Sequence, residues 1–332
     1  MDETTPVEQL FELVDDLTKT IQQELSITYL EAIAEAGEDI FQGTVVQRIS
    51  AEEKDRLEQS LEEKMPEAME QEDIRKAFQL ALIKGMKQSV QQHHAITPDA
   101  VAIFMGYLVD KLMNGRKEFV VADPAVGTGN LLSAVLNQLS EKNIEAYGSE
   151  VDETLIKIAY TLANLQEHAV QLFHQDSIEQ FGAPAPDVVM SDLPVGYYPK
   201  NQIAELYQLG GTDGKSYVHH LLVEGMMNRL KPGGFMMLLI PNNLFEDEKA
   251  AELQAYVKRH AHTLGLLQLP ETMFQAKEAS KSIWMLQKKS PDVKQPGQAL
   301  LAELPSFSRQ EALQDMMKRI NDWFVQEGFI DK

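Results

Sequence analysis

The sequence predicts an α/β protein, with an all-helical N-terminal domain before a doubly wound, mostly parallel sheet of seven strands and an antiparallel hairpin at its edge. Two observations carry this prediction. From residue 96 onward, short apolar runs alternate with segments of helical length, the order found in parallel sheets covered on both faces. Before that point, apolar residues recur at three- and four-residue steps, which indicates amphipathic helices.

The N-terminal helices are predicted from apolar stripes and from residues that begin or end helices. The first stripe consists of Leu10, Leu13, Leu17, Ile21 and Leu25. A second helix is expected over 29–40, ending before Gly43. The segment SAEE at 50–53 predicts a capping box that begins a third helix, and Pro66 is expected to end that helix. A fourth helix is expected around Ile74, Phe78 and Leu82.

Seven apolar runs after residue 96 are predicted to be strands. They lie at 119–122, 145–149, 171–174, 188–191, 235–240, 264–269 and 282–287. Helices are expected between most of them, at 130–141, 153–165, 217–230 and 248–260. Only a short loop joins the last two strands, so these are expected to form the antiparallel edge hairpin. A polar link and one or two helices around 313–324 complete the chain.

Length and composition set the domain organisation. A chain of 332 residues can bury a sizeable core. The expected domains are a helical domain (1–92), the sheet domain (93–290) and a helical C-terminal extension (291–332). No apolar run approaches the roughly 20 residues of a membrane span, and the acidic N-terminus does not resemble a signal peptide, so a cytoplasmic protein without a membrane partner is expected.

Residue types exclude several kinds of site. The chain has no cysteine, which excludes disulfides and thiolate metal sites. The pairs His93–His94 and His219–His220 lack a second ligand at helical spacing, so no metal is expected. The formal charge of −21 disfavours DNA as a partner, because neutralising phosphates requires clustered Lys and Arg.

The segment VVADPAVGTGNLL, at 120–132, has the features of a cofactor loop. A predicted strand ends at Asp123, Gly127 and Gly129 let a ligand approach the backbone, and a helix beginning near Asn130 offers free N–H groups. The next strand ends with Glu150, where a carboxylate can bind ribose hydroxyls. These features predict a nucleotide-type cofactor at this end of the sheet.

The aspartate-led form of this loop resembles motif I of class I S-adenosylmethionine-dependent methyltransferases. The resemblance continues along the chain through AITPDAVAIFM, HQDSI, LKPGGFMMLLIPNNLF and LLQLPETMFQAKEASKSIWMLQKK, about 200 residues from 96 to 289. Together these segments are similar to N6-adenine DNA methyltransferases, and most of all to the modification subunits of type I restriction systems. The resemblance implies a Rossmann-like domain and S-adenosylmethionine as cofactor. It implies cofactor-binding roles for Thr97, Asp123, Pro124, Ala125, Gly127, Gly129, Asn130, Leu131, Glu150, Val151, Asp176, Ser177 and Asp192.

The segment SDLPVGYYPK, at 191–200, resembles the acceptor motif of these enzymes, Asn/Asp-Pro-Pro-Phe/Tyr. The motif accepts hydrogen bonds from a planar amino group and stacks a flipped-out base on its aromatic ring. This implies acceptor-positioning roles for Asp192, Leu193, Pro194 and Tyr197. Val195 replaces the aromatic ring and Leu193 the first proline, so the motif is degenerate. Tyr197 or Tyr198 either provides a substitute platform or simply packs the loop.

Three functions therefore remain open. The first is N6-adenine methylation of DNA. The second is methylation of a planar amide nitrogen in a protein such as a basic or ribosomal partner, which suits the acidic charge better. The third is a catalytically degenerate protein that binds the cofactor and regulates or scaffolds. Little chain is left for target recognition, so specificity for DNA would come from the helical N-terminal domain or from a separate specificity subunit.

Overall fold

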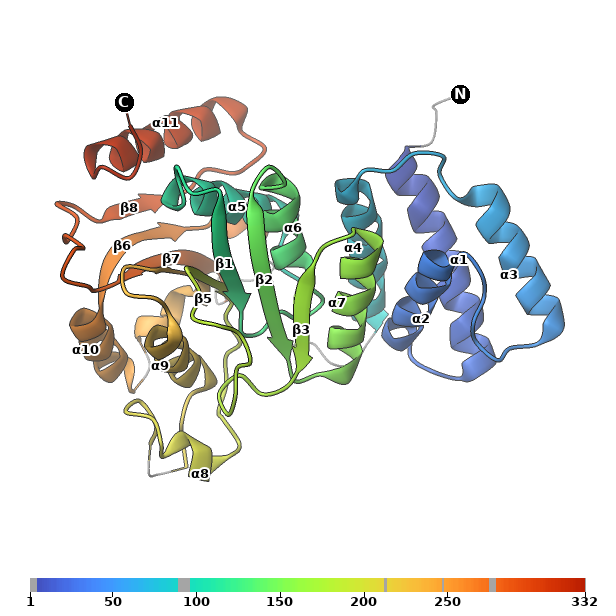
Figure 1. The fold of residues 1–332 in the computed structure, drawn as a ribbon, viewed down its shortest axis with the longest axis horizontal. Helices are drawn as coiled ribbons and strands as arrows, with labels where there is room; N and C mark the ends of the chain where they lie inside the picture. Colours follow the sequence, from blue (N-terminus) through green and yellow to red (C-terminus); the bar gives the residue numbers. More distant parts are fainter. Residues whose placement is uncertain (1–4, 89–95, 212–213, 247, 275–278, 332) are drawn as a thin grey trace. The chain divides into compact units, whose positions relative to one another are not determined.

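The computed structural model describes residues 5–88, 96–211, 214–246, 248–274 and 279–331 (Figure 1). Its strands are β1 (Glu118–Asp123), β2 (Asn143–Glu150), β3 (Val170–His174), β4 (Val188–Asp192), β5 (Phe235–Pro241), β6 (Ala261–Gln268), β7 (Lys281–Lys288) and β8 (Leu300–Glu303). Its helices are α1 (Pro6–Leu25), α2 (Tyr29–Gln42), α3 (Ala51–Lys64), α4 (Gln71–Gln88), α5 (Asp99–Leu112), α6 (Asn130–Gln138), α7 (Glu153–Leu165), α8 (Asn201–Ala204), α9 (Val218–Arg229), α10 (Ala250–His260) and α11 (Gln310–Gln326).

The described strands form one sheet in the order β3-β2-β1-β4-β5-β7-β6-β8. β1 pairs in parallel with β2 and with β4, and β4 pairs in parallel with β5. β7 runs antiparallel to both β5 and β6. The predicted doubly wound, mostly parallel sheet with an antiparallel hairpin and a helical N-terminal region is confirmed.

Two details of the predicted sheet are wrong. The described sheet has eight strands rather than seven, because β8 lies in the segment predicted to be a polar link. β8 pairs in parallel with β6, so the hairpin of β6 and β7 is not the edge of the sheet. Only four residues long, β8 has one buried apolar residue, Leu300, and one exposed, Leu301. So short a segment gives almost no periodic signal.

The chain groups into two compact units. The first consists of Met1–Ala102, Val126–Gln138 and Glu150–His174. The second consists of Ile103–Ala125, Leu139–Ser149 and Gln175–Lys332. The domain boundaries expected after residues 92 and 290 stay predictions.

In the first unit, the N-terminal helices share their core with α7. The apolar stripes of α1, α2 and α4 pack with Ile158 and Leu162 of α7, all almost completely buried. Gly37 allows α2 to approach α7 closely, because a Cβ atom at this position would lie 2.1 Å from the methyl group of Thr161. Figure 1 shows α1, α2, α4 and α7 side by side. The helical region is therefore continuous with a helix of the sheet domain.

The second helix ends where it was predicted to end, because Gly43 is the C-cap of α2. The capping box predicted at Ser50 is wrong: its side chain makes no capping hydrogen bond, and the carboxylate of Glu53 instead accepts one from Arg56 at 2.7 Å. Capping boxes begin α1 at Thr5 and α2 at Thr28, each with a glutamate three residues later. Pairing with Arg56 removes the carboxylate that the Ser50 box requires.

Asp39 makes the stability of the first unit depend on pH. Burial raises the pKa of this carboxyl to about 7, although the backbone N–H of Val46 donates to it at 2.9 Å. In the unfolded chain an aspartate has a pKa of about 3.9, so the folded state binds the proton of Asp39 more tightly than the unfolded state does. The stability gained from this proton is present below about pH 4 and is lost as the pH rises to about 7.

We expect Asp39→Asn to stabilise the protein at alkaline pH. The gain should be about 2 kcal/mol larger at about pH 8 than at about pH 5, because the neutral amide avoids ionising a buried carboxylate. Thermal or urea unfolding of both proteins at the two pH values measures the difference. Asp55→Asn, which changes an exposed carboxyl on α3, is the control. A gain for Asp39→Asn that is equal at both pH values would contradict the prediction.

In the second unit, the C-terminal helix α11 packs through buried aromatic rings. Phe324 is fully buried, and the indole N–H of Trp323 donates to the carbonyl of Gln298 at 2.7 Å. The hydroxyl of Tyr107 on α5 donates to Asn321 at 2.9 Å. Among the described helices, none combines the length and the apolar composition needed to cross a bilayer.

Candidate functional site

The predicted site residues fall into two groups, one in each compact unit. The second unit contains Asp123, Pro124, Ala125, Asp176, Ser177, Asp192, Leu193, Pro194 and Tyr197. The first unit contains Thr97, Gly127, Gly129, Asn130, Leu131, Glu150 and Val151. The roles of these residues stay predictions, and the contacts within each group show what holds them.

Asp123 ends β1 with an almost completely buried carboxylate. Its Oδ1 atom accepts hydrogen bonds from the backbone N–H of Ala125 at 3.0 Å and from the hydroxyl of Ser191 at 2.8 Å. Ser191 lies on β4, which pairs with β1. The carboxylate therefore joins the beginning of the first loop to the end of the neighbouring strand.

Asp176 connects the predicted cofactor residues to the acceptor loop. Its Oδ1 atom accepts from the backbone N–H of Ile178 at 3.0 Å. Its Oδ2 atom accepts from the hydroxyl of Tyr198 at 2.8 Å and from the ammonium of Lys200 at 3.2 Å. Burial, together with the hydrogen bond to Asp176, raises the pKa of Tyr198, which keeps its phenol a proton donor. The next residue, Ser177, donates to the carbonyl of Pro124 at 2.6 Å.

Asp192, the last residue of β4, forms an ion pair that the sequence did not predict. The ammonium of Lys281 lies 2.5 Å from its Oδ1 atom, and the two side chains are only 16% and 24% exposed. Lys281 begins β7 opposite Pro241 of β5, and Asp192 lies opposite Leu239 of the same strand. The sheet thus brings a cation from the hairpin to the predicted acceptor carboxylate.

The two adjacent tyrosines have different environments. Tyr198 is buried, and its backbone N–H donates to the carbonyl of Ser216 at 2.8 Å. Tyr197 is 60% exposed, and its ring stacks on Tyr217 with the centroids 5.1 Å apart and the planes 18° apart. Tyr198 therefore packs the loop. Tyr197 keeps much of its ring exposed and stays the predicted stacking platform, beside an exposed Val195.

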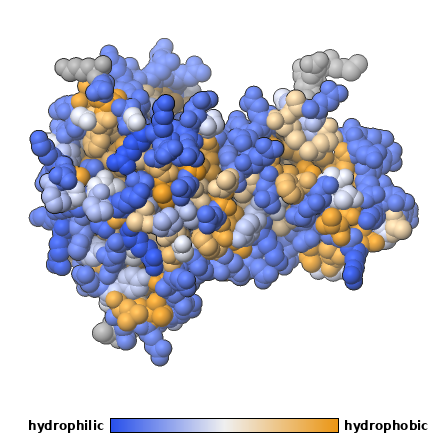
Figure 2. Space-filling view, in the orientation of Figure 1, coloured by the Kyte–Doolittle hydropathy of each residue, from blue (hydrophilic) through white to orange (hydrophobic). Residues whose placement is uncertain are grey.

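Large apolar side chains are exposed along the segment that follows β4. Val195, Tyr197 and Leu206 are 59%, 60% and 80% exposed. The face shown in Figure 2 is mostly hydrophilic, with a hydrophobic patch over α8. Exposed apolar side chains that gather in one segment are typical of contact surfaces.

In the first unit, Gly127 and Gly129 both adopt left-handed backbone conformations, with φ of 55° and 82°. Side chains disfavour these conformations, which explains the two glycines. The backbone N–H of Gly127 donates to the carboxylate of Glu150 at 3.0 Å. The other oxygen of Glu150 accepts from the backbone N–H groups of Val151 and Asp152 at 2.8 and 3.0 Å. Glu150 therefore ties the glycine loop to the beginning of α7.

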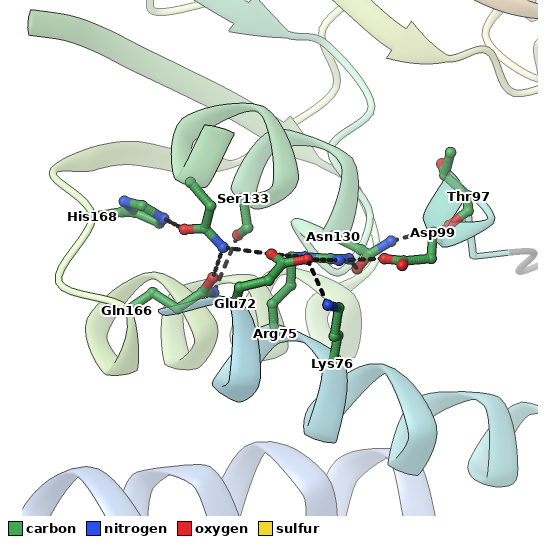
Figure 3. Close-up of polar contacts among 10 residues, drawn as sticks. Glu72, Arg75, Lys76, Thr97, Asp99, Asn130, Ser133, Gln166 and His168 are labelled. Atoms are coloured by element: carbon green, nitrogen blue, oxygen red, sulfur yellow. Dashed lines mark hydrogen bonds and ion pairs between the residues drawn. The ribbon is translucent and has the colours of Figure 1, made fainter. Parts of the chain in front are cut away.

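Asn130, the first residue of α6, has its side chain held from two sides (Figure 3). Its amide nitrogen donates to the carbonyl of Thr97 at 3.0 Å. Its amide oxygen accepts from the guanidinium of Arg75, on α4, at 2.8 Å. Both polar ends of Asn130 are thus occupied by the protein itself.

The glycine loop fits the chemistry of an adenosine-type cofactor. A Cβ atom at Gly127 would meet no described atom within 4 Å, so the backbone there can be approached. The first N–H groups of α6 have no partner within the helix, which suits negatively charged or polar groups of a ligand. A carboxylate such as that of Glu150 has lone pairs for ribose hydroxyls in addition to its backbone donors.

The described residues include no cluster of three or more His, Asp or Glu side chains that could hold a metal ion. His219 and His220 are buried on α9, where the ring of His219 stacks on Tyr217. His93 and His94 lie outside the described residues.

Family models match nearly the whole chain. Residues 8–86 match the YtxK N-terminal helical domain, and residues 85–327 match the N-6 DNA methylase family. YtxK of Bacillus subtilis (strain 168), an uncharacterised protein, is 45% identical over 96% of this chain and 97% of its own length.

Solved structures give the same result. A structure from Listeria monocytogenes, described as a candidate class I S-adenosylmethionine-dependent methyltransferase, matches with a TM-score of 0.91 and 38% identity, over 96% of this chain and 99% of that one. The methyltransferase subunit of a type I restriction-modification system from Streptococcus thermophilus matches with a TM-score of 0.63 over 96% and 74% of the two chains. At 13% identity, the second match shows the fold alone.

Proposed function

Because this chain belongs to the N-6 DNA methylase family, and is thus a methyltransferase, we propose that it transfers the methyl group of S-adenosylmethionine to adenine N6 in DNA. The observation that carries this proposal is the joining of two strand ends. Asp123, which begins the predicted cofactor loop, accepts a hydrogen bond from Ser191, the residue immediately before the acceptor carboxylate Asp192.

The proposed cofactor residues are those of the predicted set. The bound cofactor supplies an electrophilic methyl group on a sulfonium. Asp123 and Glu150 hold the beginning and the middle of the loop through backbone N–H groups. Asp176, already bonded to Tyr198, has lone pairs left for the amino group of the cofactor's adenine.

Asp192 and the carbonyl of Leu193 are proposed to accept the two N–H groups of the substrate's amino nitrogen. An aromatic amino nitrogen is a poor nucleophile because its lone pair is delocalised into the ring. Acceptors that hold both hydrogens position the lone pair for an in-line transfer, and the nitrogen loses one proton as the N–CH₃ bond replaces the S–CH₃ bond. Leu193 is itself fixed by its backbone N–H, which donates to the carbonyl of Leu239 at 3.0 Å.

Tyr197 is proposed to replace the missing aromatic ring at Val195. Base stacking on an aromatic ring contributes about 1–3 kcal/mol per base. Tyr197 lies two residues after Val195, with its ring largely exposed and supported from behind by Tyr217. A flat substrate can therefore stack on the face of Tyr197 that is turned away from Tyr217.

Two other functions have a specific observation in their favour. The charge of −21 and the aliphatic Val195 favour a planar amide nitrogen in a basic protein partner. The ion pair of Asp192 with Lys281 favours a catalytically degenerate, regulatory cofactor-binding protein. In each case we propose that a protein partner or specificity subunit binds through the helical N-terminal region, and that the activity is cytoplasmic.

Transfer of a labelled methyl group distinguishes the three. We expect S-adenosylmethionine with a tritiated methyl group to label unmethylated DNA as N6-methyladenine. Asp192→Ala should reduce this at least about 100-fold, because transition-state hydrogen bonds of this kind are worth that much. Asp292→Ala is the control, because it removes an exposed carboxylate in the segment between β7 and β8. Label in lysate proteins alone would support the amide function, and cofactor binding with no labelled acceptor would support the regulatory one.

A further inference from the structure

Arg75 is a charged side chain with no exposed surface, and it is the fifth residue of α4. Its Nε and Nη2 atoms donate to the two carboxylate oxygens of Glu72 at 2.8 and 2.6 Å. Nη2 also donates to Asp99, and Nη1 to Asn130 at 2.8 Å. Taking a guanidinium out of water is costly unless ion pairs and hydrogen bonds compensate it. Each of the three guanidinium nitrogens of Arg75 has such a partner.

These contacts join the N-terminal helical region to the beginning of α6. Asn130 follows Gly129 directly, and its side chain lies between Arg75 and the carbonyl of Thr97 (Figure 3). Asn130 is therefore held from α4 on one side and from the Thr97 segment on the other. These contacts hold the side chain of the first residue of α6.

The far end of α6 is held by Glu72, which is also the ion-pair partner of Arg75. Asn137 donates to Glu72 at 3.0 Å and to Gln166 at 3.1 Å, and its oxygen lies 2.7 Å from Nε2 of His168. Burial would raise the pKa of Glu72, but the hydrogen bonds from Arg75 and Asn137 outweigh it and hold the pKa below its usual value. Glu72 thus stays an ionised acceptor, and α4 holds α6 along its length.

The glycine loop needs such an anchor. Gly127 and Gly129 have the least restricted backbones of any residue type, so they do not by themselves fix where the following N–H groups point. Glu150 holds the loop at Gly127, and the backbone N–H of Gly129 donates to the carbonyl of Val126 at 2.9 Å. The side chain of Asn130 is bonded to Arg75.

We propose that Arg75 is a positioning residue for cofactor binding, acting through Asn130 on the loop that the proposed function assigns to S-adenosylmethionine. The N-terminal helical domain is then part of the cofactor-binding machinery, in addition to any contact it makes with a partner. This inference rests on the proposed function for its ligand, and on the Arg75 contacts for its structure.

The test compares Arg75→Lys with Arg56→Lys in the full-length protein. Lysine keeps the charge beside Glu72 and Asp99, which favours folding, but a compact ammonium does not span three partners as a guanidinium does. Arg56 is the control, because it also forms ion pairs with acids of the helical region, Asp16 and Glu53. Arg56 itself lies on α3 and not on α4. Thermal unfolding establishes that each variant is folded. Arg75→Met is the stronger change where it folds.

Two readouts are measured well below the unfolding temperature: the Kd for S-adenosylmethionine, and amide hydrogen exchange of residues 126–133 without cofactor. We expect Arg75→Lys to raise the Kd about 10-fold or more and to accelerate exchange in this segment, with Arg56→Lys unchanged in both. Wild-type Kd and exchange in Arg75→Lys, or equal effects in Arg56→Lys, would overturn the proposal. If the wild type does not bind S-adenosylmethionine, the proposed function fails, and exchange still decides whether Arg75 holds the loop.

Discussion

Asp123→Ala is expected to weaken S-adenosylmethionine binding at least about 100-fold, equivalent to about 2.7 kcal/mol. The buried Oδ1 atom accepts from both Ala125 and Ser191, and leaving two such donors unsatisfied costs about 1–3 kcal/mol each. The loop also loses the hydrogen bond that holds the backbone N–H of Ala125 at its beginning. Isothermal titration calorimetry measures the change.

Two further variants separate the loop contact from the strand contact. Asp123→Asn keeps an oxygen acceptor and should lose less affinity than Asp123→Ala. Ser191→Ala removes only the hydroxyl donor and should have a small effect on the Kd. If Asp123→Ala folds and binds the cofactor as the wild type does, the assignment of this loop to the cofactor is wrong.

Lys281→Met is expected to increase methyl transfer to a neutral amino nitrogen about 10-fold to 100-fold. The ammonium occupies the Asp192 oxygen that the substrate's N–H group needs. It also opposes the positive charge that develops on the nitrogen, since two unit charges about 4 Å apart interact by about 4 kcal/mol at an effective dielectric constant of about 20. Methionine keeps much of the side-chain volume without the charge.

The increase should appear in kcat, with the Kd for S-adenosylmethionine unchanged, in a methyl-transfer assay with adenine-containing DNA. Lys289→Met is the matched control, because Lys289 follows the same strand but donates to the carbonyl of Lys258 rather than to Asp192. A fall in activity for Lys281→Met would show instead that this cation takes part in substrate binding.

The elements with strong local signals were predictable from the sequence. The helix expected at 153–165 has these bounds in the structure as α7, because its apolar residues face a core along its whole length. The apolar runs before Asp123 and Asp192 are strands, as predicted, and most of their residues are buried. The edge of the sheet was predicted wrongly because β8 was not recognised as a strand. Its four residues are too few to show a periodic pattern.

The contacts that tune the candidate site were not predictable, because they join residues far apart in the chain. Lys281 is one of many lysines, and only the pairing of β5 with β7 brings it to Asp192. Arg75 lies in an ordinary amphipathic helix, and its burial depends on Asn130, which is remote in sequence. The capping boxes at Thr5 and Thr28 did have a local signal, Thr followed three residues later by Glu.

We expect this chain to bind S-adenosylmethionine at the loop that begins with Asp123. A calorimetric titration of S-adenosylmethionine into the wild-type protein tests it most directly. We expect saturable binding at one site per chain with a micromolar Kd. No detectable binding, in a protein shown to be folded, would contradict it.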